Sequence, residues 1–504
     1  MSKFNIYLPL IIILIISKFL FVNEYFINYS PVDDNLFIDI AGSYIYGDFS
    51  YNPYMLSKLH GFPLILFILN KISLSYILLL NILMAICFLI FLSIKTSLVS
   101  WEKIFIGFLF LFNPFTLMND WVYILREPLF SLIMILILLN FYFIFYRSLN
   151  KNFLIISLLI LLQIFFFIRE EALLLYLSMI IIFLFINNKI NLKNILIFII
   201  TPLLFFVLAW SIFSSINEKK YDVNLTHDIL EGEFSNLLGN IAKIDTDEIY
   251  NTDTFITKKK LILLSEISPT FRLIEPAIPI INSTNSASCI NHSNCDDYSI
   301  GYIIWWIKKA PFTTGVAIDH KSEQNIYKNI SYEINRACSD NIINCGITNN
   351  LNLRNIPIKF ADNFFKFIDK LFFHKYSSAT RINMNLENFT YEKVLHKYPL
   401  SKFSIGPISL YADSLKLYFK FYEIMIAVLY FISLIGFTAC IIKKIKISNF
   451  TFNFHIFIFS YLTFLSIISL VAGSFDSRML MPLNLFISLF VYMTFKEFLQ
   501  KKIL

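Results

Sequence analysis

Charged side chains are scarce in this chain. Asp, Glu, Lys and Arg account for 15% of its 504 residues, against roughly 25% in a typical soluble domain. Hydrophobic residues make up 57%, and the mean hydropathy is +0.66. Long apolar runs separated by short charged knots recur along the chain, as expected when lipid is the solvent. The composition therefore argues against a soluble protein and indicates a polytopic integral membrane protein.

Several common catalytic motifs are also missing. The sequence has no GxxxxGKS/T phosphate loop, no HExxH zinc helix and no GxSxG nucleophile elbow, which argues against an ATP-driven pump, a zincin and a serine hydrolase. The net charge is +7, but no long basic run with interleaved aromatics occurs. Nucleic acid is therefore not an expected partner.

Ten apolar runs are candidates for crossing a bilayer, which takes about 20 mostly apolar residues. The predicted spans are 5–22, 73–94, 104–118, 129–146, 153–168, 172–187, 194–214, 418–442, 451–471 and 479–496. No small-residue cleavage site follows the first run, so we expect it to stay as a signal-anchor helix. The apolar stretch 61–69 is too short to cross, and we expect it to lie at the interface or to re-enter the membrane.

Loop charges alternate from one predicted span to the next. If the N-terminus is cytoplasmic, the inside segments hold mainly Lys, with Glu102 and Glu497 as their only acids, and the outside segments hold mixed knots of acids and Arg. This pattern follows the positive-inside rule. It predicts an inner-membrane protein with both termini in the cytoplasm.

A long polar region, 215–417, separates the seventh and eighth predicted spans and would lie outside. It is long enough for a core of its own, and we expect a mixed α/β or mostly helical domain. The predicted architecture is thus a mainly α transmembrane bundle with an inserted extracytoplasmic domain. Residues 1–214 form the N-terminal membrane module, with a first outer loop at 23–60, and residues 418–504 form the C-terminal membrane helices.

Four cysteines lie in this region in two close pairs. An oxidising compartment favours the local disulfides Cys289–Cys295 and Cys338–Cys345, although four cysteines allow three connectivities. The alternative is a metal site made of Cys289, His292, Cys295 and Asp296. No second pair of ligands with zinc-like spacing accompanies it.

The first outer loop carries an adjacent acidic pair, Asp33 and Asp34. Apolar residues follow at helical spacing, at Phe37, Ile40, Ala41, Tyr44 and Ile45. Gly47 is a natural stop signal. We therefore expect an amphipathic helix at the membrane surface that begins at the acidic pair. The two carboxylates either cap this helix, or one of them serves as a catalytic base or as a ligand for a divalent metal.

Three more charged knots fall on the predicted outer face, at 126–128, 169–171 and 476–478. Each also has a purely structural explanation, which is an Arg–Glu pair at a helix end for 126–128, a tight polar turn for 169–171 and a helix cap for 476–478. Three charges pressed between two spans, as at 169–171, are costly unless they face protein or a wet cavity. Arg suits a phosphate, and a carboxylate suits the proton of an acceptor hydroxyl. The candidate phosphate- or substrate-binding residues are Arg126, Glu127, Arg169, Glu170 and Arg478.

The order of these elements resembles the GT-C superfamily of glycosyltransferases, in particular the bacterial lipopolysaccharide-core and lipid A aminosugar transferases and the protein O-mannosyltransferases. The similarity rests on the acidic pair, Gly-Phe-Pro-Leu at 61–64, Asn-Pro at 113–114, Arg-Glu-Pro at 126–128, Arg-Glu-Glu at 169–171 and Arg478. Ile168 stands where many relatives have Thr. The similarity covers residues 1–215 and, more weakly, 470–490. The inserted region 215–417 departs from better-known members, whose soluble domain follows the last span.

The resemblance implies an active site at the outer leaflet and a polyprenyl-phosphate sugar as donor. It implies that Asp33 or Asp34 is the base or helps to hold a divalent metal, the one cofactor that it suggests. Arg126, Arg169 and Arg478 are then the candidates for neutralising the leaving lipid phosphate. The inserted region leaves the acceptor open, as a lipid or a cell-envelope glycan.

The sequence therefore predicts a membrane glycosyltransferase, and two other interpretations remain. One is an envelope-glycan polymerase, ligase or flippase, and the other is a receptor or scaffold that binds through 215–417. A transporter is less favoured because it would more often show charge near the bilayer midplane or broken helices in symmetric halves. Lys18 is the only charge well inside a predicted span, where it could snorkel to the interface.

Overall fold

The computed structural model describes most of the chain and shows a mainly helical protein. The described residues are 7–23, 33–94, 98–116, 126–146, 151–173, 175–176, 179, 196–246, 256–279, 297–298, 300–346, 361, 363–368, 371, 408–443, 445, 447–472 and 480–500. Within them no strand forms beyond an isolated antiparallel bridge between Ile244 and Cys345. The prediction of a mainly α fold is confirmed.

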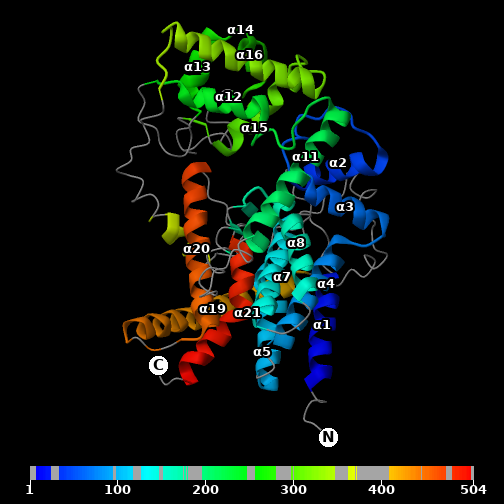
Figure 1. Ribbon diagram of the computed structural model, residues 1–504, viewed down its shortest axis with the longest axis vertical. Helices are drawn as coiled ribbons and strands as arrows, with labels where there is room; N and C mark the ends of the chain where they lie inside the picture. The colour runs from blue at the N-terminus through cyan, green and yellow to red at the C-terminus, as the bar shows by residue number, and fades with distance from the viewer. Residues whose placement is uncertain are drawn as a thin grey trace.

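Most helices of the described chain fall into two groups. The bundle contains α1 (Tyr7–Asn23), α4 (Tyr76–Ile94), α5 (Ser100–Leu111), α7 (Arg126–Tyr146), α8 (Lys151–Ile168), α11 (Thr201–Tyr221), α19 (Ile408–Ile442), α20 (Asn449–Ala472) and α21 (Met481–Gln500). The second group contains α12 (Gly232–Lys243), α13 (Lys258–Ile267), α14 (Pro269–Ile274), α15 (Ile300–Thr313) and α16 (His320–Ser339). Helix α11 runs from the bundle toward this second group (Figure 1).

Five helices are long and apolar enough to cross a membrane within the described ranges. They are Tyr76–Ser93, Arg126–Ile144, Leu196–Tyr221, Lys420–Ile442 and Met481–Gln500. Shorter apolar helices occur at Leu8–Phe19, Asn152–Ile168 and Thr451–Ile467, where spans were also predicted. The predicted third span is interrupted, since α5 ends at Leu111 and a 3₁₀ turn follows at Pro114–Thr116. The predicted span 172–187 is described only in part.

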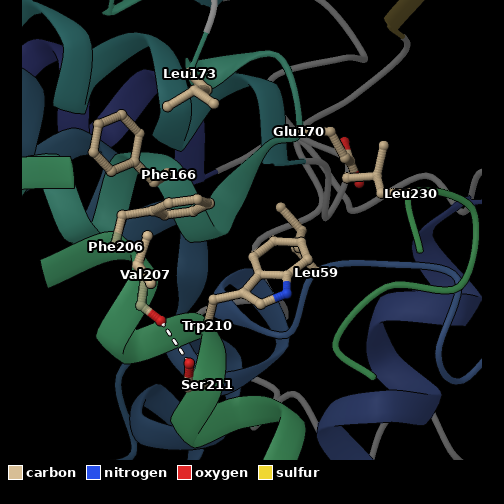
Figure 2. A pocket seen from close by; sticks show the side chains of 9 residues that line it. All are labelled: Leu59, Phe166, Glu170, Leu173, Phe206, Val207, Trp210, Ser211 and Leu230. Atoms are coloured by element: carbon tan, nitrogen blue, oxygen red, sulfur yellow. Dashed lines mark hydrogen bonds between the residues drawn. The ribbon is translucent and has the colours of Figure 1, made fainter. Parts of the chain in front are cut away.

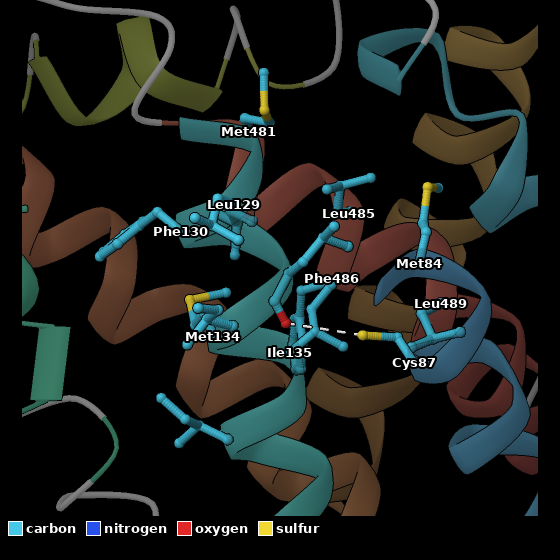
Figure 3. Close-up of a cluster of buried hydrophobic side chains, with 14 of the residues drawn as sticks. Met84, Cys87, Leu129, Phe130, Met134, Ile135, Met481, Leu485, Phe486 and Leu489 are labelled. Atoms are coloured by element: carbon cyan, nitrogen blue, oxygen red, sulfur yellow. Dashed lines mark hydrogen bonds between the residues drawn. The ribbon is translucent and has the colours of Figure 1, made fainter. Parts of the chain in front are cut away.

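Helix α7 lies at the centre of the bundle because it is apolar on all sides. Of its long apolar stretch Arg126–Ile144, 78% is buried inside the protein, compared with 11% for Leu196–Tyr221. Figure 3 shows Leu129, Phe130 and Ile135 of α7 among side chains of α4 and α21. Cys87 of α4 donates to the carbonyl of Leu132 over 3.8 Å. Helices far apart in the sequence therefore share one apolar core.

Lys18 does not snorkel, contrary to the expectation from the sequence. Its side chain is buried, and Nζ donates to the carbonyl oxygen of Thr116 at 3.0 Å and to Thr116 Oγ1 at 2.8 Å. The 3₁₀ turn at Pro114–Thr116 supplies these acceptors inside the bundle. A buried ammonium group needs such partners when water is excluded.

The helix predicted after the acidic pair is present as α2 (Asp33–Tyr46). Gly47 ends it with φ of +70° and an N–H that donates to the carbonyl of Ser43. The apolar residues of the helix pack against protein, and Asp39 lies at an exposed position. Phe37 and Ala41 belong to the main core, whereas Leu36 and Ile40 belong to a second cluster with Met55, Leu56, Tyr221, Val223 and Leu225. Protein therefore covers α2 on two sides.

The short apolar stretch after α2 forms α3 (Gly61–Lys71), which packs against α2 and α8. A Cβ atom at Gly61 would overlap the backbone carbonyl of Phe167 at the end of α8. The glycine is therefore needed for the close approach of α3 to α8. This contact brings the loop that precedes α3 next to the residues that follow α8.

The second helix group has its own apolar core. Its helices agree with one of the two predictions for 215–417, a mostly helical domain. Phe234, Ile241, Ile303, Ile307 and Ile330 are fully buried there. A disulfide joins Cys338 and Cys345, one of the two pairs that the sequence suggests. Cys289 and Cys295, and with them the alternative metal site, lie outside the described residues.

A buried cation fixes the chain between α11 and the second helix group. Lys308 Nζ forms ion pairs with Asp228 and, at 2.7 Å, with Glu323, and all three side chains are fully buried. Tyr327 donates to Glu323 at 2.9 Å. Burial opposes ionisation of Glu323, but Lys308 and His320 outweigh it and lower the pKa of this carboxyl. The network holds Asp228, and therefore the loop around it, in one position.

Replacing Lys308 with Met should strongly destabilise this part of the protein. It leaves Asp228 and Glu323 buried without their lysine, a change that costs about 3–5 kcal/mol of unfolding free energy. Lys321→Met is the control, because its pair with Asp222 is exposed (60% and 71%), and it should not change stability measurably. Thermal unfolding of both purified variants in detergent checks this. Equal unfolding temperatures would contradict the role given to Lys308.

Candidate functional site

The charged knots at 126–128 and 169–171 bind each other crosswise. Arg126 begins α7 and Arg169 directly follows α8, so the two knots lie at the same end of this helix pair. Arg126 Nη1 lies 2.8 Å from Glu170 Oε2, and Arg169 Nη1 lies 3.2 Å from Glu127 Oε1. Each arginine thus pairs with the acid of the other knot. The local Arg126–Glu127 pair that the sequence offered as a structural explanation does not form.

Arg169 is fully engaged in this cluster. Besides Glu127, it contacts both oxygens of Glu171, with Nε 3.0 Å from Oε2 and Nη2 3.1 Å from Oε1. The side chains of Arg169 and Glu127 are only 4% and 5% exposed. A buried pair with this many bonds is structural in character, since removing either partner would strand a charge. Arg169 is therefore a poor candidate for gripping a ligand.

Arg126 and Glu170 are more accessible than Arg169 and Glu127. Their side chains are 10% and 19% exposed. Arg126 Nη1 contacts both carboxylate oxygens of Glu170 and lies 3.4 Å from the carbonyl of Ile168. Burial alone would raise the pKa of the Glu170 carboxyl, but Arg126 and His227 hold it well below the ordinary value of 4.5.

His227 is a site residue that the sequence analysis missed. Its Nε2 lies 3.3 Å from Glu170 Oε1, and its side chain is 3% exposed. The loop after α11 carries it, and Glu231 holds this loop by accepting from the backbone N–H of His227 at 3.2 Å and from Trp210 Nε1 at 3.1 Å. Nothing in the sequence around His227 distinguishes it, because its partner is 57 positions away and is reached only through the fold.

Lys58 is a second cation that the sequence analysis did not select. Its buried side chain places Nζ 4.8 Å from the ring centre of Trp305 and 5.9 Å from that of Phe37. The guanidinium carbon of Arg126 lies 5.6 Å from the same Phe37 ring. The positive charge of Lys58 also helps to lower the pKa of Glu170. Arg126 and Lys58 therefore meet at one aromatic ring beside Glu170.

Phe37 also ties the acidic pair of the first loop to this site. It lies on α2, one helical turn after the first residue of that helix, Asp33, and one turn rises about 5.4 Å. The beginning of α2 is thus a neighbour of the Arg126 cluster. The side chains of Asp33 and Asp34, and all of Arg478, lie outside the described residues.

An apolar cavity of about 340 Å³ opens next to Glu170. Its walls come from the end of α8, from α11 and from the loops before α3 and after α11. Figure 2 shows its lining, which consists of Leu59, Phe166, Glu170, Leu173, Phe206, Val207, Trp210, Ser211 and Leu230. Glu170 is the only ionisable residue among them. Neighbouring side chains of α11, such as Leu204 and Leu208, are exposed, so the cavity adjoins a face suited to lipid.

The charges of the site largely cancel. Arg126, Arg169 and Lys58 stand against Glu127, Glu170 and Glu171. Arg126 and Arg169, two of the three predicted phosphate-binding arginines, are therefore paired with carboxylates of the protein itself. Among the described residues, no group of three or more His, Cys, Asp or Glu is placed to hold a metal ion.

No protein-family model, curated protein or solved structure matches this chain.

Acid should destabilise the protein in part through Glu170. Because its folded pKa lies below 4.5, ionised Glu170 stabilises the fold at higher pH. That stabilisation is lost as the pH falls from about 4.5 toward the folded pKa. The unfolding temperature of the wild type should therefore drop steeply in acid, and that of Glu170→Gln should drop less. Parallel pH profiles for the two proteins would show that the Arg126–Glu170 contact contributes nothing.

Proposed function

We propose that this protein is a membrane glycosyltransferase that moves a sugar from a polyprenyl-phosphate donor to a lipid or cell-envelope glycan on the outer face of the membrane. One observation carries the proposal. A cluster of cations and carboxylates around Arg126 and Glu170 lies at the end of an apolar cavity and beside the start of α2. These are the three environments that the substrates of such a reaction require.

The donor needs an apolar surface and a cationic one in contact. An isoprenoid chain gains free energy from leaving water, and the cavity between α8 and α11 offers Phe166, Phe206 and Val207. A phosphate needs cations, and Arg126 and Lys58 stand at the polar end. Arg126 is the best phosphate ligand of the predicted set, because Arg169 is committed to Glu127 and Glu171.

The proposed reaction is a direct displacement. The acceptor hydroxyl oxygen attacks the anomeric carbon of the sugar, and the bond from that carbon to the phosphate oxygen breaks, so the configuration inverts. Asp33 or Asp34 takes the hydroxyl proton as general base. Cations at the site stabilise the negative charge that grows on the departing phosphate. The predicted role of Arg478 and the assistance of a divalent metal remain part of this proposal.

The topology belongs to the proposal as well. The five long apolar helices, together with α1, α8, α20 and the apolar runs around 104–118 and 172–187, make up ten spans. Helices α12–α16 then belong to an extracytoplasmic domain, 215–417, inserted before the last three spans. In support, the beginning of α1 and the end of α21 lie at the end of the molecule opposite α12–α16 (Figure 1). That arrangement fits cytoplasmic termini in an inner-membrane protein.

Removing the proposed base should abolish transfer. In membranes with matched protein levels, we expect Asp33→Asn or Asp34→Asn to lower the rate of sugar transfer by about 10²–10⁴-fold, the usual contribution of a general base. The readouts are labelled sugar on the acceptor fraction and release of polyprenyl phosphate from labelled donor. Asp39→Asn is the matched control, since it removes a carboxylate from an exposed position of the same helix.

Two results would count against the proposal. Full activity in both Asp33→Asn and Asp34→Asn would remove the assigned base. Movement of labelled lipid across the bilayer by the purified protein, without release of polyprenyl phosphate, would instead identify a flippase.

A further inference from the structure

The carboxylate of Glu170 occupies the point where two cations, Arg126 and Lys58, and the imidazole of His227 converge from different parts of the fold. Arg126 reaches it from the start of α7, at 2.8 and 2.9 Å. His227 reaches it from the loop after α11, at 3.3 Å. Lys58 acts on it electrostatically from the loop before α3. Glu170 itself belongs to the short turn after α8 rather than to a helix.

This arrangement has the chemistry of an anion site. Arginine binds carboxylate and phosphate with the same planar fork, so the groups around Glu170 would serve a phosphate equally well. The same carboxylate also stands at the end of the apolar cavity. An anion bound there could carry a hydrophobic chain that continues along Phe166, Phe206 and Val207.

We propose that Arg126, His227 and Lys58 form a binding site for the phosphate of an isoprenyl lipid, and that Glu170 occupies this site as an internal stand-in until the lipid displaces it. This inference rests on the proposed function for the identity of the lipid. It adds a resting state in which the protein covers its own anion site, and it adds His227 to the binding residues.

The neighbouring acids explain why Glu170 is the one to be displaced. Glu127 and Glu171 both belong to Arg169, and Glu127 is nearly inaccessible. Glu170 is 19% exposed and borders the cavity. The phosphate of the proposed donor is a diester with one negative charge, like the carboxylate it would replace. The isoprenyl phosphate released from it is a monoester with about −1.5 to −2 charges near neutral pH. Either phosphate can therefore take the place of one carboxylate beside Arg126, His227 and Lys58.

Filling the site from within lowers the apparent affinity for ligand, because only the fraction of molecules with an open site can bind. Binding to the purified full-length protein in detergent would be measured for farnesyl phosphate, inorganic phosphate and farnesol. Glu170→Gln should bind farnesyl phosphate at least about tenfold more tightly than the wild type. Glu171→Gln removes a neighbouring charge of similar exposure, and it should bind like the wild type.

The double variant Arg126→Gln/Glu170→Gln should lose the tighter binding of farnesyl phosphate that Glu170→Gln shows. It removes the main cation of the site and leaves no unpaired carboxylate at position 170. If the wild type binds farnesyl phosphate and Glu170→Gln binds it equally well or more weakly, the stand-in role of Glu170 is overturned. The proposed function would remain intact. If farnesyl phosphate binds no more tightly than farnesol to the wild type and to every variant, both the stand-in role and the proposed function are overturned. Inorganic phosphate binding as tightly as farnesyl phosphate would overturn the assignment to a lipid.

A measurement on the wild type covers the case in which Glu170→Gln does not fold. A carbodiimide with an amine nucleophile modifies accessible carboxyl groups, and mass spectrometry of peptides locates the modification. Farnesyl phosphate should increase modification of Glu170 severalfold and leave Glu171 unchanged. Unchanged or decreased modification of Glu170 at saturating farnesyl phosphate would contradict displacement.

Discussion

The site depends on one constraint: charges pressed between apolar helices must find partners within the protein. Arg126 and Arg169 meet this constraint by exchanging acids between two knots, with Glu170 and Glu127 as their respective partners. The exchange fixes the start of α7 to the end of α8. Gly61 then allows α3 to approach α8 closely, which brings Lys58 and the loop before α3 to the same place. The apolar cavity beside Glu170 forms where these elements and α11 meet.

Two adjacent residues connect this site to the second helix group. His227 faces Glu170, while Asp228 forms its ion pair with buried Lys308. The backbone N–H of Asp228 also donates to the carbonyl of Leu56 at 3.0 Å, two positions before Lys58. A change in the packing of α15 against α16 would therefore shift the positions of both His227 and Lys58. This is a physical route by which the inserted region could influence the proposed chemistry.

The sequence allowed the helix boundaries to be predicted best where a local signal marks them. The acidic pair and Gly47 predicted α2 to within a residue at each end, because capping and left-handed termination are local effects. The crosswise pairing of the knots could not be predicted, since it depends on which helix ends meet. His227 and Lys58 could not be identified from the sequence for the same reason. Lys18 was expected to snorkel to the interface because its acceptor, Thr116, lies 98 positions away.

The central claim is that a lipid-linked phosphate binds with its chain in the cavity between α8 and α11 and its phosphate at Arg126. Photo-crosslinking tests it directly, with an isoprenyl phosphate that carries a diazirine in its chain and with peptide mapping by mass spectrometry. The account predicts crosslinks to Phe166, Phe206 or Val207 that excess farnesyl phosphate suppresses and excess farnesol suppresses less. Specific crosslinks confined to α19, α20 and α21, with none on α8 or α11, would contradict it.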